Sequence, residues 1–183
     1  ILISSAKNSA VNTPQNPVML AGKTVTIKGT DETTEASPAN VSTVTAPKLN
    51  VTAGDGVTIT GSGAIPLIAD DNGGECAVTL NAGGDVEIVN KGGMAVFGPL
   101  TVTEAHNVTI GGGGTSLLYS ANGVHCINAS GTVKMESSGI VCSGNDANGL
   151  TITGAETVDI AGESTSAPVV TGMTLNECGA ATV

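Results

Sequence analysis

The chain has 183 residues, of which 40% are hydrophobic, and a formal net charge of −10. This length suits one domain with a substantial core, and six lysines without any arginine leave no basic stripe for a nucleic acid backbone. No apolar run is long enough to span a bilayer as a helix, so a transmembrane segment is not expected.

The hydrophobic residues are almost all aliphatic. There is no tryptophan, one phenylalanine (Phe97) and one tyrosine (Tyr119), against 26 glycines. Valine, isoleucine and threonine dominate between Gly, Asn and Asp clusters, a composition typical of many short strands joined by turns. The composition therefore predicts an all-β fold with an aliphatic core.

The first segment, residues 1–17, contains Pro14 and Pro17 and is expected to be an irregular lead-in. It opens on Ile1 and not on methionine, so we expect a processed or excised piece of a longer protein. The remaining residues, 18–183, form the predicted domain, which we expect to continue in the longer native chain.

From residue 18 onward the chain repeats one pattern: apolar, any, apolar, five residues, apolar, any, apolar. Five segments fit without gaps, the segment at Val18 fits with its internal turn shortened by one residue, and a last one ends at Val183. The repeat length varies from 22 to 29 residues, as between Val86 and Val108 or between Val57 and Val86. In chain order, the segments begin at Val18, Leu49, Val78, Leu100, His125, Leu150 and Met173.

Each segment contains two stretches of period-two alternation, which is strand geometry, and a third apolar cluster follows at a variable distance. The positions between the apolar ones are mostly Thr and Asn, as expected when every second side chain faces solvent. Three strands per repeat and no helix predict a right-handed, single-stranded parallel β-helix, in which each coil buries its apolar side against its neighbours. A β-sandwich is the main alternative.

Glycine-punctuated phrases carry a family resemblance. The stretches 56–61, 107–112 and 149–154 resemble the repeats of pectate-lyase-like β-helices in large secreted or wall-attached bacterial surface proteins. The resemblance covers roughly residues 18–183 and implies an adhesin or a carbohydrate-binding protein at the cell surface. It implies little about activity, because fold does not determine function.

The densest acidic cluster is the loop Asp70-Asp71-Asn72-Gly73-Gly74-Glu75. Asp70, Asp71 and Glu75 are candidate Ca²⁺ ligands, although Asp, Asn and Gly are equally the residues of a solvated turn. No other cofactor is expected. The Asp pair is similar to the paired aspartates of polygalacturonases, but the Gly-His-Gly and Arg-Ile-Lys motifs of that family are missing.

The remaining reactive side chains have structural interpretations. His125 occupies an inward slot of the apolar ladder, and His106 lies in a turn. The four cysteines share no slot and lack zinc-site spacing, so we expect mostly reduced thiols with one disulfide as an open alternative. Lys134 and Asp159 should be neighbours on adjacent coils.

These features predict a non-enzymatic structural or interaction module of an extracellular or cell-surface bacterial protein, a stalk or adhesin segment. Its partners would be a protein or glycan on a surface and neighbouring domains of the same chain. The alternative is carbohydrate binding, or remnant polysaccharide-lyase or glycoside-hydrolase chemistry, with Phe97 and Tyr119 in adjacent coils as the candidate sugar-stacking residues. A further alternative is an ice-binding face formed by the Thr and Asn ladders.

Overall fold

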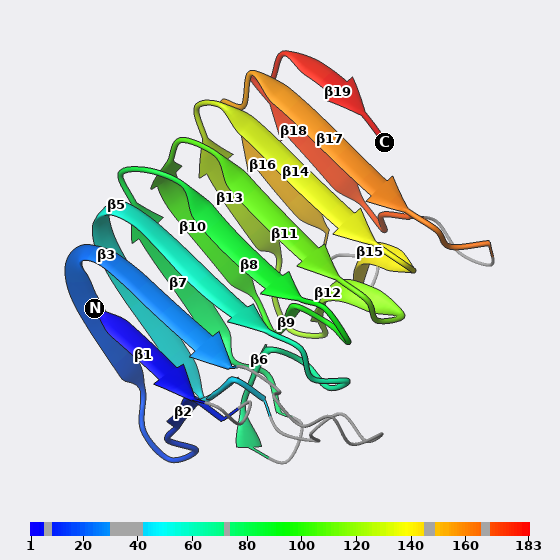
Figure 1. Cartoon of the computed structure of the whole chain (residues 1–183). Helices are drawn as coiled ribbons and strands as arrows, with labels where there is room; N and C mark the ends of the chain where they lie inside the picture. Colours follow the sequence, from blue (N-terminus) through cyan, green and yellow to red (C-terminus); the bar gives the residue numbers. More distant parts are fainter. Residues whose placement is uncertain (6–8, 30–41, 72–73, 145–148, 166–168) are drawn as a thin grey trace.

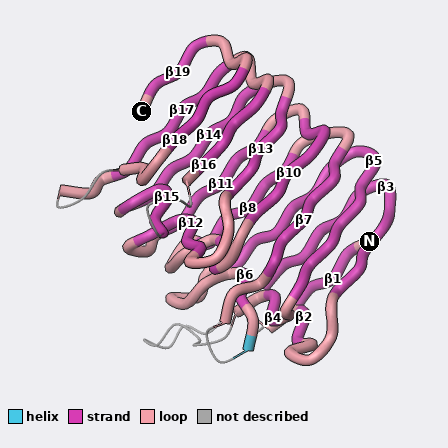
Figure 2. Tube along the Cα trace, turned by 180° about the vertical axis from the view of Figure 1, so that it is seen from behind, coloured by secondary structure: helices cyan, strands magenta, loops and turns pink. Residues whose placement is uncertain are grey.

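The chain winds as short parallel strands stacked coil on coil, and each full coil contributes one strand to each of three faces (Figure 1). The computed structural model describes residues 1–5, 9–29, 42–71, 74–144, 149–165 and 169–183. Their strands pair in parallel throughout, which is the arrangement of the predicted parallel β-helix and excludes a β-sandwich. Apart from one 3₁₀ residue at Asp71, the described residues form strands, turns and bends (Figure 2).

Faces 1 and 2 together make a 13-stranded sheet, because two long strands, β3 (Val18–Gly29) and β5 (Lys48–Gly61), run through the corner between these faces. Face 1 holds the first halves of β3 and β5 together with β7 (Ala77–Ala82), β10 (Leu100–Ala105), β13 (His125–Ala129), β16 (Leu150–Thr153) and β18 (Met173–Asn176). Face 2 holds the second halves with β1 (Leu2–Ser5), β8 (Val86–Asn90), β11 (Val108–Gly112), β14 (Thr132–Ser137), β17 (Thr157–Gly162) and β19 (Ala180–Thr182).

Face 3 is a separate six-stranded sheet of shorter strands. It corresponds to the third apolar cluster of each repeat, and the bridge between Cys142 and Val170 extends it by one position. Its strands are β2 (Val11–Asn12), β4 (Val44–Thr45), β6 (Ile68–Ala69), β9 (Val96–Phe97), β12 (Ser116–Ser120) and β15 (Ile140–Gly144).

The register follows the repeat found in the sequence. Val57, Val86 and Val108 are paired on successive strands of face 2, and Val133, Val158 and Ala181 continue that ladder. On the first coil the pairing of β3 with β5 shifts between Gly22 and Thr24, where the sequence predicts a turn one residue shorter. The spacing of apolar residues was therefore enough to predict which strand positions stack.

Inward side chains form one aliphatic core along the axis of the solenoid. Val, Leu and Ile ladders are almost fully buried, and each such side chain contributes roughly 1.5–3 kcal/mol relative to exposure. Asn107 supplies a polar tie at the corner between faces 1 and 2: its amide donates to Asp85 Oδ1 at 3.0 Å, and its Oδ1 accepts from Thr132 N at 2.8 Å. One side chain thus links three consecutive coils.

Residues 1–17 contain more regular structure than expected. Strand β1 pairs with the second half of β3, with Ile3 opposite Ile27, and β2 pairs with β4. The coil stack therefore begins with residue 2 and not with residue 18. The reason is that Ile1 and Ile3 continue the alternating apolar pattern of face 2, a signal too short to separate from a loop in the sequence. No helix long and apolar enough to span a bilayer occurs in the described part of the chain.

Candidate functional site

The two aromatic side chains of the protein meet on face 3. Phe97 of β9 and Tyr119 of β12 are directly paired in the ladder, and both are half-buried. Their ring centroids lie 5.3 Å apart with an interplanar angle of 12°, which is a stacked pair. The placement in adjacent coils predicted from the sequence is confirmed. Because the rings cover one face of each other, a ligand could reach only their outer faces and edges.

Small side chains stand beside the stack. Ser143 pairs with Tyr119 on the next strand, and its hydroxyl lies 2.8 Å from that of Ser116. On the other side, Ile68 pairs with Val96, so the next residue, Ala69, lies beside Phe97. Phe97 and Tyr119 are therefore two large side chains with small neighbours on both adjacent strands. These neighbours leave space beside the outer face of each ring.

The acidic loop lies at the corner where face 3 strands turn into face 1. Glu75 extends past the short turn Gly98-Pro99 of the next coil and accepts hydrogen bonds from the turn beyond it. The donors are Ala121 N to Oε1, a short contact, and Asn122 Nδ2 to Oε2 at 3.2 Å. This pair of bonds, called the Glu75 clasp below, ties coils that are two apart.

The corner beneath the clasp is tight. Gly98 has φ of +133°, and a Cβ at this position would collide with the backbone of Cys76. Gly98 therefore allows the turn of its coil to pack directly against the backbone of Cys76, the residue after Glu75. The clasp places the acidic loop and the turn that follows Tyr119 at the same corner, so the aromatic and acidic candidates from the sequence belong to one region.

The calcium prediction is not tested by this geometry. Asp70 Oδ1 accepts a hydrogen bond from Asp71 N at 2.8 Å, and the Glu75 carboxylate is engaged in the clasp. Asn72 and Gly73 of the same loop lie outside the described residues. Among the described residues, no group of three or more His, Cys, Asp or Glu side chains is placed to hold a metal ion. Ca²⁺ binding by Asp70, Asp71 and Glu75 stays a prediction.

His125 is inward and fully buried, as its slot in the ladder predicts. Neither ring nitrogen has a hydrogen-bond partner, and burial lowers the pKa of its imidazole to about 4, against a smaller opposing effect of the Glu75 carboxylate. His106 is exposed, and its Nδ1 lies 3.2 Å from Ser130 Oγ. The structure keeps the two imidazoles in separate places, one in the core and one on a turn.

All four cysteines are free thiols. Burial raises the pKa of Cys76 to about 12, with a further contribution from the charge of Asp70, and raises that of Cys142 to about 11. Cys126 is half-buried on the outward ladder of face 1, as its slot predicts. The two buried thiols are therefore protonated near neutral pH and unsuited to nucleophilic chemistry.

The outward side of face 1 carries two uncharged ladders. Asn50, Thr79 and Thr101 are aligned across adjacent strands, and Thr52, Asn81 and Thr103 run beside them. The ladder predicted from the sequence is confirmed as a geometric feature, with Cys126 interrupting it. An ice-binding role stays a prediction, which a thermal-hysteresis measurement tests.

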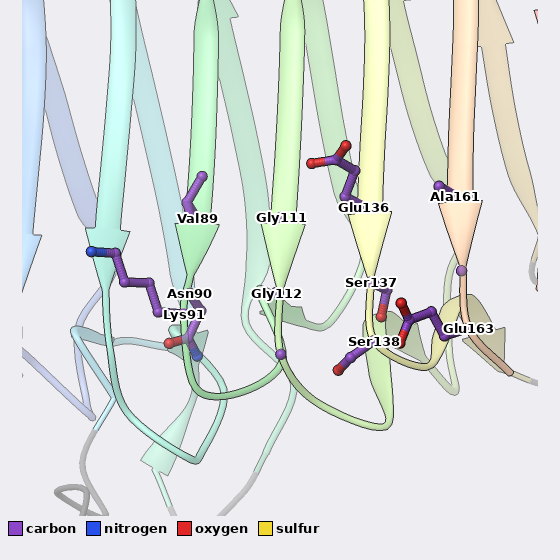
Figure 3. A pocket seen from close by; sticks show the side chains of 12 residues that line it. Val89, Asn90, Lys91, Gly111, Gly112, Glu136, Ser137, Ser138, Ala161 and Glu163 are labelled. Atoms are coloured by element: carbon purple, nitrogen blue, oxygen red, sulfur yellow. The ribbon is translucent and has the colours of Figure 1, made fainter.

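Face 2 carries a concave surface that the sequence did not predict. It is a shallow groove of about 520 Å³ that crosses the ends of β8, β11, β14 and β17 on face 2 (Figure 3). Gly111, Gly112 and Gly113 line its middle, and Glu136, Ser138 and Glu163 line the far side. The run Gly111–Gly114 was the available signal, but in the sequence it is typical of a flexible turn.

Lys134 and Asp159 are opposite each other on β14 and β17, as predicted, but Lys134 forms its ion pair with Glu136. Lys134 Nζ lies 2.7 Å from Glu136 Oε1, two residues along the same strand, and this hydrogen bond raises the pKa of the lysine. Both side chains are exposed, so the pair adds little stability.

The fold and these sites define a parallel β-solenoid with a half-buried aromatic stack on face 3 and a shallow groove on face 2. No protein-family model matches the chain, and no curated protein or solved structure matches it either. The resemblance to pectate-lyase-like surface proteins is thus supported at the level of the β-helix fold alone.

Proposed function

We propose that the chain is a non-enzymatic interaction module, a stalk or adhesin segment of a secreted or surface-displayed bacterial protein. The observation that carries this proposal is the register kept from coil to coil, with one shift in the β3–β5 pairing and one in the β10–β13 pairing, which makes a stiff rod with long, regular outer faces. In a solenoid of this kind each coil contacts only its neighbours, so the side surfaces are available to partners.

The ionisable groups support the same role. Lys23 pairs with Asp55 at 3.5 Å and Lys134 with Glu136, both on exposed surface. The buried candidates, His125 and the two core thiols, point into the aliphatic core, where a substrate has no access. A general acid or base must come within hydrogen-bond reach of a substrate, and these groups do not meet that condition.

The test combines binding with turnover. The purified chain is incubated with a panel of plant and microbial polysaccharides, and both new reducing ends and unsaturated lyase products are measured alongside retention on immobilised polysaccharide. We expect retention without product. Product formation by the pure chain, abolished by a point mutation, would refute the non-enzymatic role. Melting curves in Ca²⁺ and in EDTA test the calcium prediction in the same samples.

A second candidate function, carbohydrate binding on face 3, is favoured by the ring stack. The outer faces of Phe97 and Tyr119 are flanked by small residues, and carbohydrate C–H groups stack on such rings. Under this function, Tyr119→Ala removes glycan retention while the variant still melts cooperatively. The control is Val124→Ala, which trims an exposed apolar side chain on the turn between faces 3 and 1 and leaves both rings in place. Equal retention by Tyr119→Ala and the native chain would exclude the ring stack.

A further inference from the structure

We propose that the groove on face 2 is a binding site for a neutral, hydroxyl-rich ligand, a short oligosaccharide. The proposal rests on the interaction role above and assigns a site that is independent of the ring stack. The groove crosses four coils at roughly 4.8 Å each, a span of about 14 Å, and its volume of about 520 Å³ lies within the range of small-molecule sites.

The floor of the groove depends on Gly111. In the outward ladder of face 2 this residue stands between Val89 and Glu136, so one missing side chain makes a depression one coil wide. A Cβ at Gly111 would have Val89 methyl groups as its nearest neighbours, at 3.7 Å, which is an ordinary contact. Packing therefore does not require glycine at Gly111, and a side chain there would fill the groove.

The next two glycines have a structural role instead. A Cβ at Gly112 would lie 2.7 Å from both Gly93 O and Leu117 Cδ1, and one at Gly113 would lie 2.5 Å from Lys91 O. These positions must be glycine for adjacent turns to approach each other. Gly111 therefore opens the groove, whereas Gly112 and Gly113 are required for close backbone packing.

The side of the groove formed by β14 and the end of β17 supplies hydrogen-bond acceptors. In Figure 3 the Glu136 side chain leans from β14 toward Gly111, and Glu163 reaches back toward Ser137. Ser138 is exposed and adds a hydroxyl, while Lys91 lies at the near end with its amine extending toward β5. Carboxylates accept hydrogen bonds from neighbouring hydroxyl groups, so a sugar fits this wall.

Charge selects among hydroxylated ligands. Lys91 in the lining and Lys134 on Glu136 offset the two carboxylates locally, so the net charge of −10 over the whole chain is what disfavours uronic acids, phosphates and other anions. A simple cation is not favoured either, because Lys134 Nζ already lies 2.7 Å from Glu136 Oε1. A neutral sugar chain satisfies the carboxylates through its hydroxyl groups and places its C–H surface against the glycine floor and Val89.

The test uses neutral tetrasaccharides of cellulose, xylan, mannan, starch and N-acetylated chitin, with tetragalacturonate as the anionic control. Binding is followed by amide NMR shifts on the full chain. We expect at least one neutral probe to shift the amides of Gly111–Gly113 and Ser138, and tetragalacturonate to leave them unchanged. Gly111→Val, which fills the groove, should weaken that binding at least tenfold while keeping the dispersed spectrum of the native fold.

Two further variants test whether the groove carboxylates bind the sugar. The exposed double variant Glu136→Ala with Glu163→Ala should also weaken binding at least tenfold, and Glu87→Ala, an exposed carboxylate on β8 outside the groove, should leave it unchanged. The proposal is overturned if no neutral probe shifts the groove amides, or if Gly111→Val and the double variant bind as the native chain does. If shifts instead cluster around Phe97 and Tyr119, the groove proposal fails while the interaction role stands.

Discussion

Replacing His125 by leucine should stabilise the protein, and more so in acid. His125 lies in the inward ladder of face 1 between Leu100 and Leu150, and both of its ring nitrogens lack partners. A buried polar group without a hydrogen bond costs about 1–3 kcal/mol. His125→Leu restores the aliphatic ladder, so the free energy of unfolding at pH 7.5 should rise by about that amount.

The pH dependence follows from proton binding. The folded pKa of His125 is about 4, below the value of 6.5 expected for the unfolded chain, so the unfolded state takes up the proton first. The contribution of His125 is constant above about pH 7 and declines as the pH falls from 6.5 toward 4. A shift of this size corresponds to a loss of about 3 kcal/mol by pH 4, since one pKa unit is worth 1.36 kcal/mol.

Urea unfolding followed by circular dichroism at several pH values between 7.5 and 4 measures both effects. The two chains differ only at this residue, so the difference between their stability curves measures the effect of the histidine and its surroundings. His106→Gln, on an exposed turn, is the control for loss of an imidazole and should follow the native curve. Parallel curves for native protein and His125→Leu would refute the reasoning, because they would mean that His125 is solvated or hydrogen-bonded in the fold.

Three other variants test the local structure by the same unfolding assay. Glu75→Ala breaks the Glu75 clasp and should cost about 1–3 kcal/mol, whereas Glu87→Ala, an exposed carboxylate on β8, should have little effect; equal losses would contradict the clasp. Gly112→Ala should lower the free energy of unfolding by about 1–3 kcal/mol through overpacking, and Gly111→Ala should be tolerated. A larger loss for Gly111→Ala than for Gly112→Ala would contradict the groove geometry. Glu104 has φ of +61°, a left-handed conformation that strains a residue with a Cβ. Glu104→Gly should therefore raise the free energy of unfolding by about 0.5–1 kcal/mol, in spite of the greater entropy that glycine gives the unfolded chain. A lower free energy of unfolding would show that this conformation is not strained.

The coil structure was predictable because the solenoid imposes a simple rule on the chain. Each inward position must be apolar in every coil, so Val57, Val86 and Val108 appear at matching places in the sequence and are paired in space. Even the shortened turn of the first coil was visible, as the shift between Gly22 and Thr24 shows. Strands β1, β2 and β4 were missed because segments of two to four residues carry too little periodicity.

The sites were less predictable than the ladder. The placement of Phe97 and Tyr119 in adjacent coils followed from the repeat, whereas their direct pairing and ring stacking were not predicted. The Glu75 clasp did not, because it depends on how far a loop side chain reaches past a short turn of another coil. The groove was hidden for a related reason: the missing side chain of Gly111 matters only once Val89 and Glu136 stand on either side of it.

The ring stack, the groove and the clasp all depend on the coil-to-coil register, which disulfide trapping tests directly. Cys126 is paired with Thr101 on face 1, and strands about 4.8 Å apart are within the Cα separation that a disulfide spans. We expect Thr101→Cys to cross-link with Cys126 under mild oxidation, and Thr103→Cys, two residues along the same strand, to remain reduced. Cross-linking of Thr103→Cys in preference to Thr101→Cys would contradict the register and every site built on it.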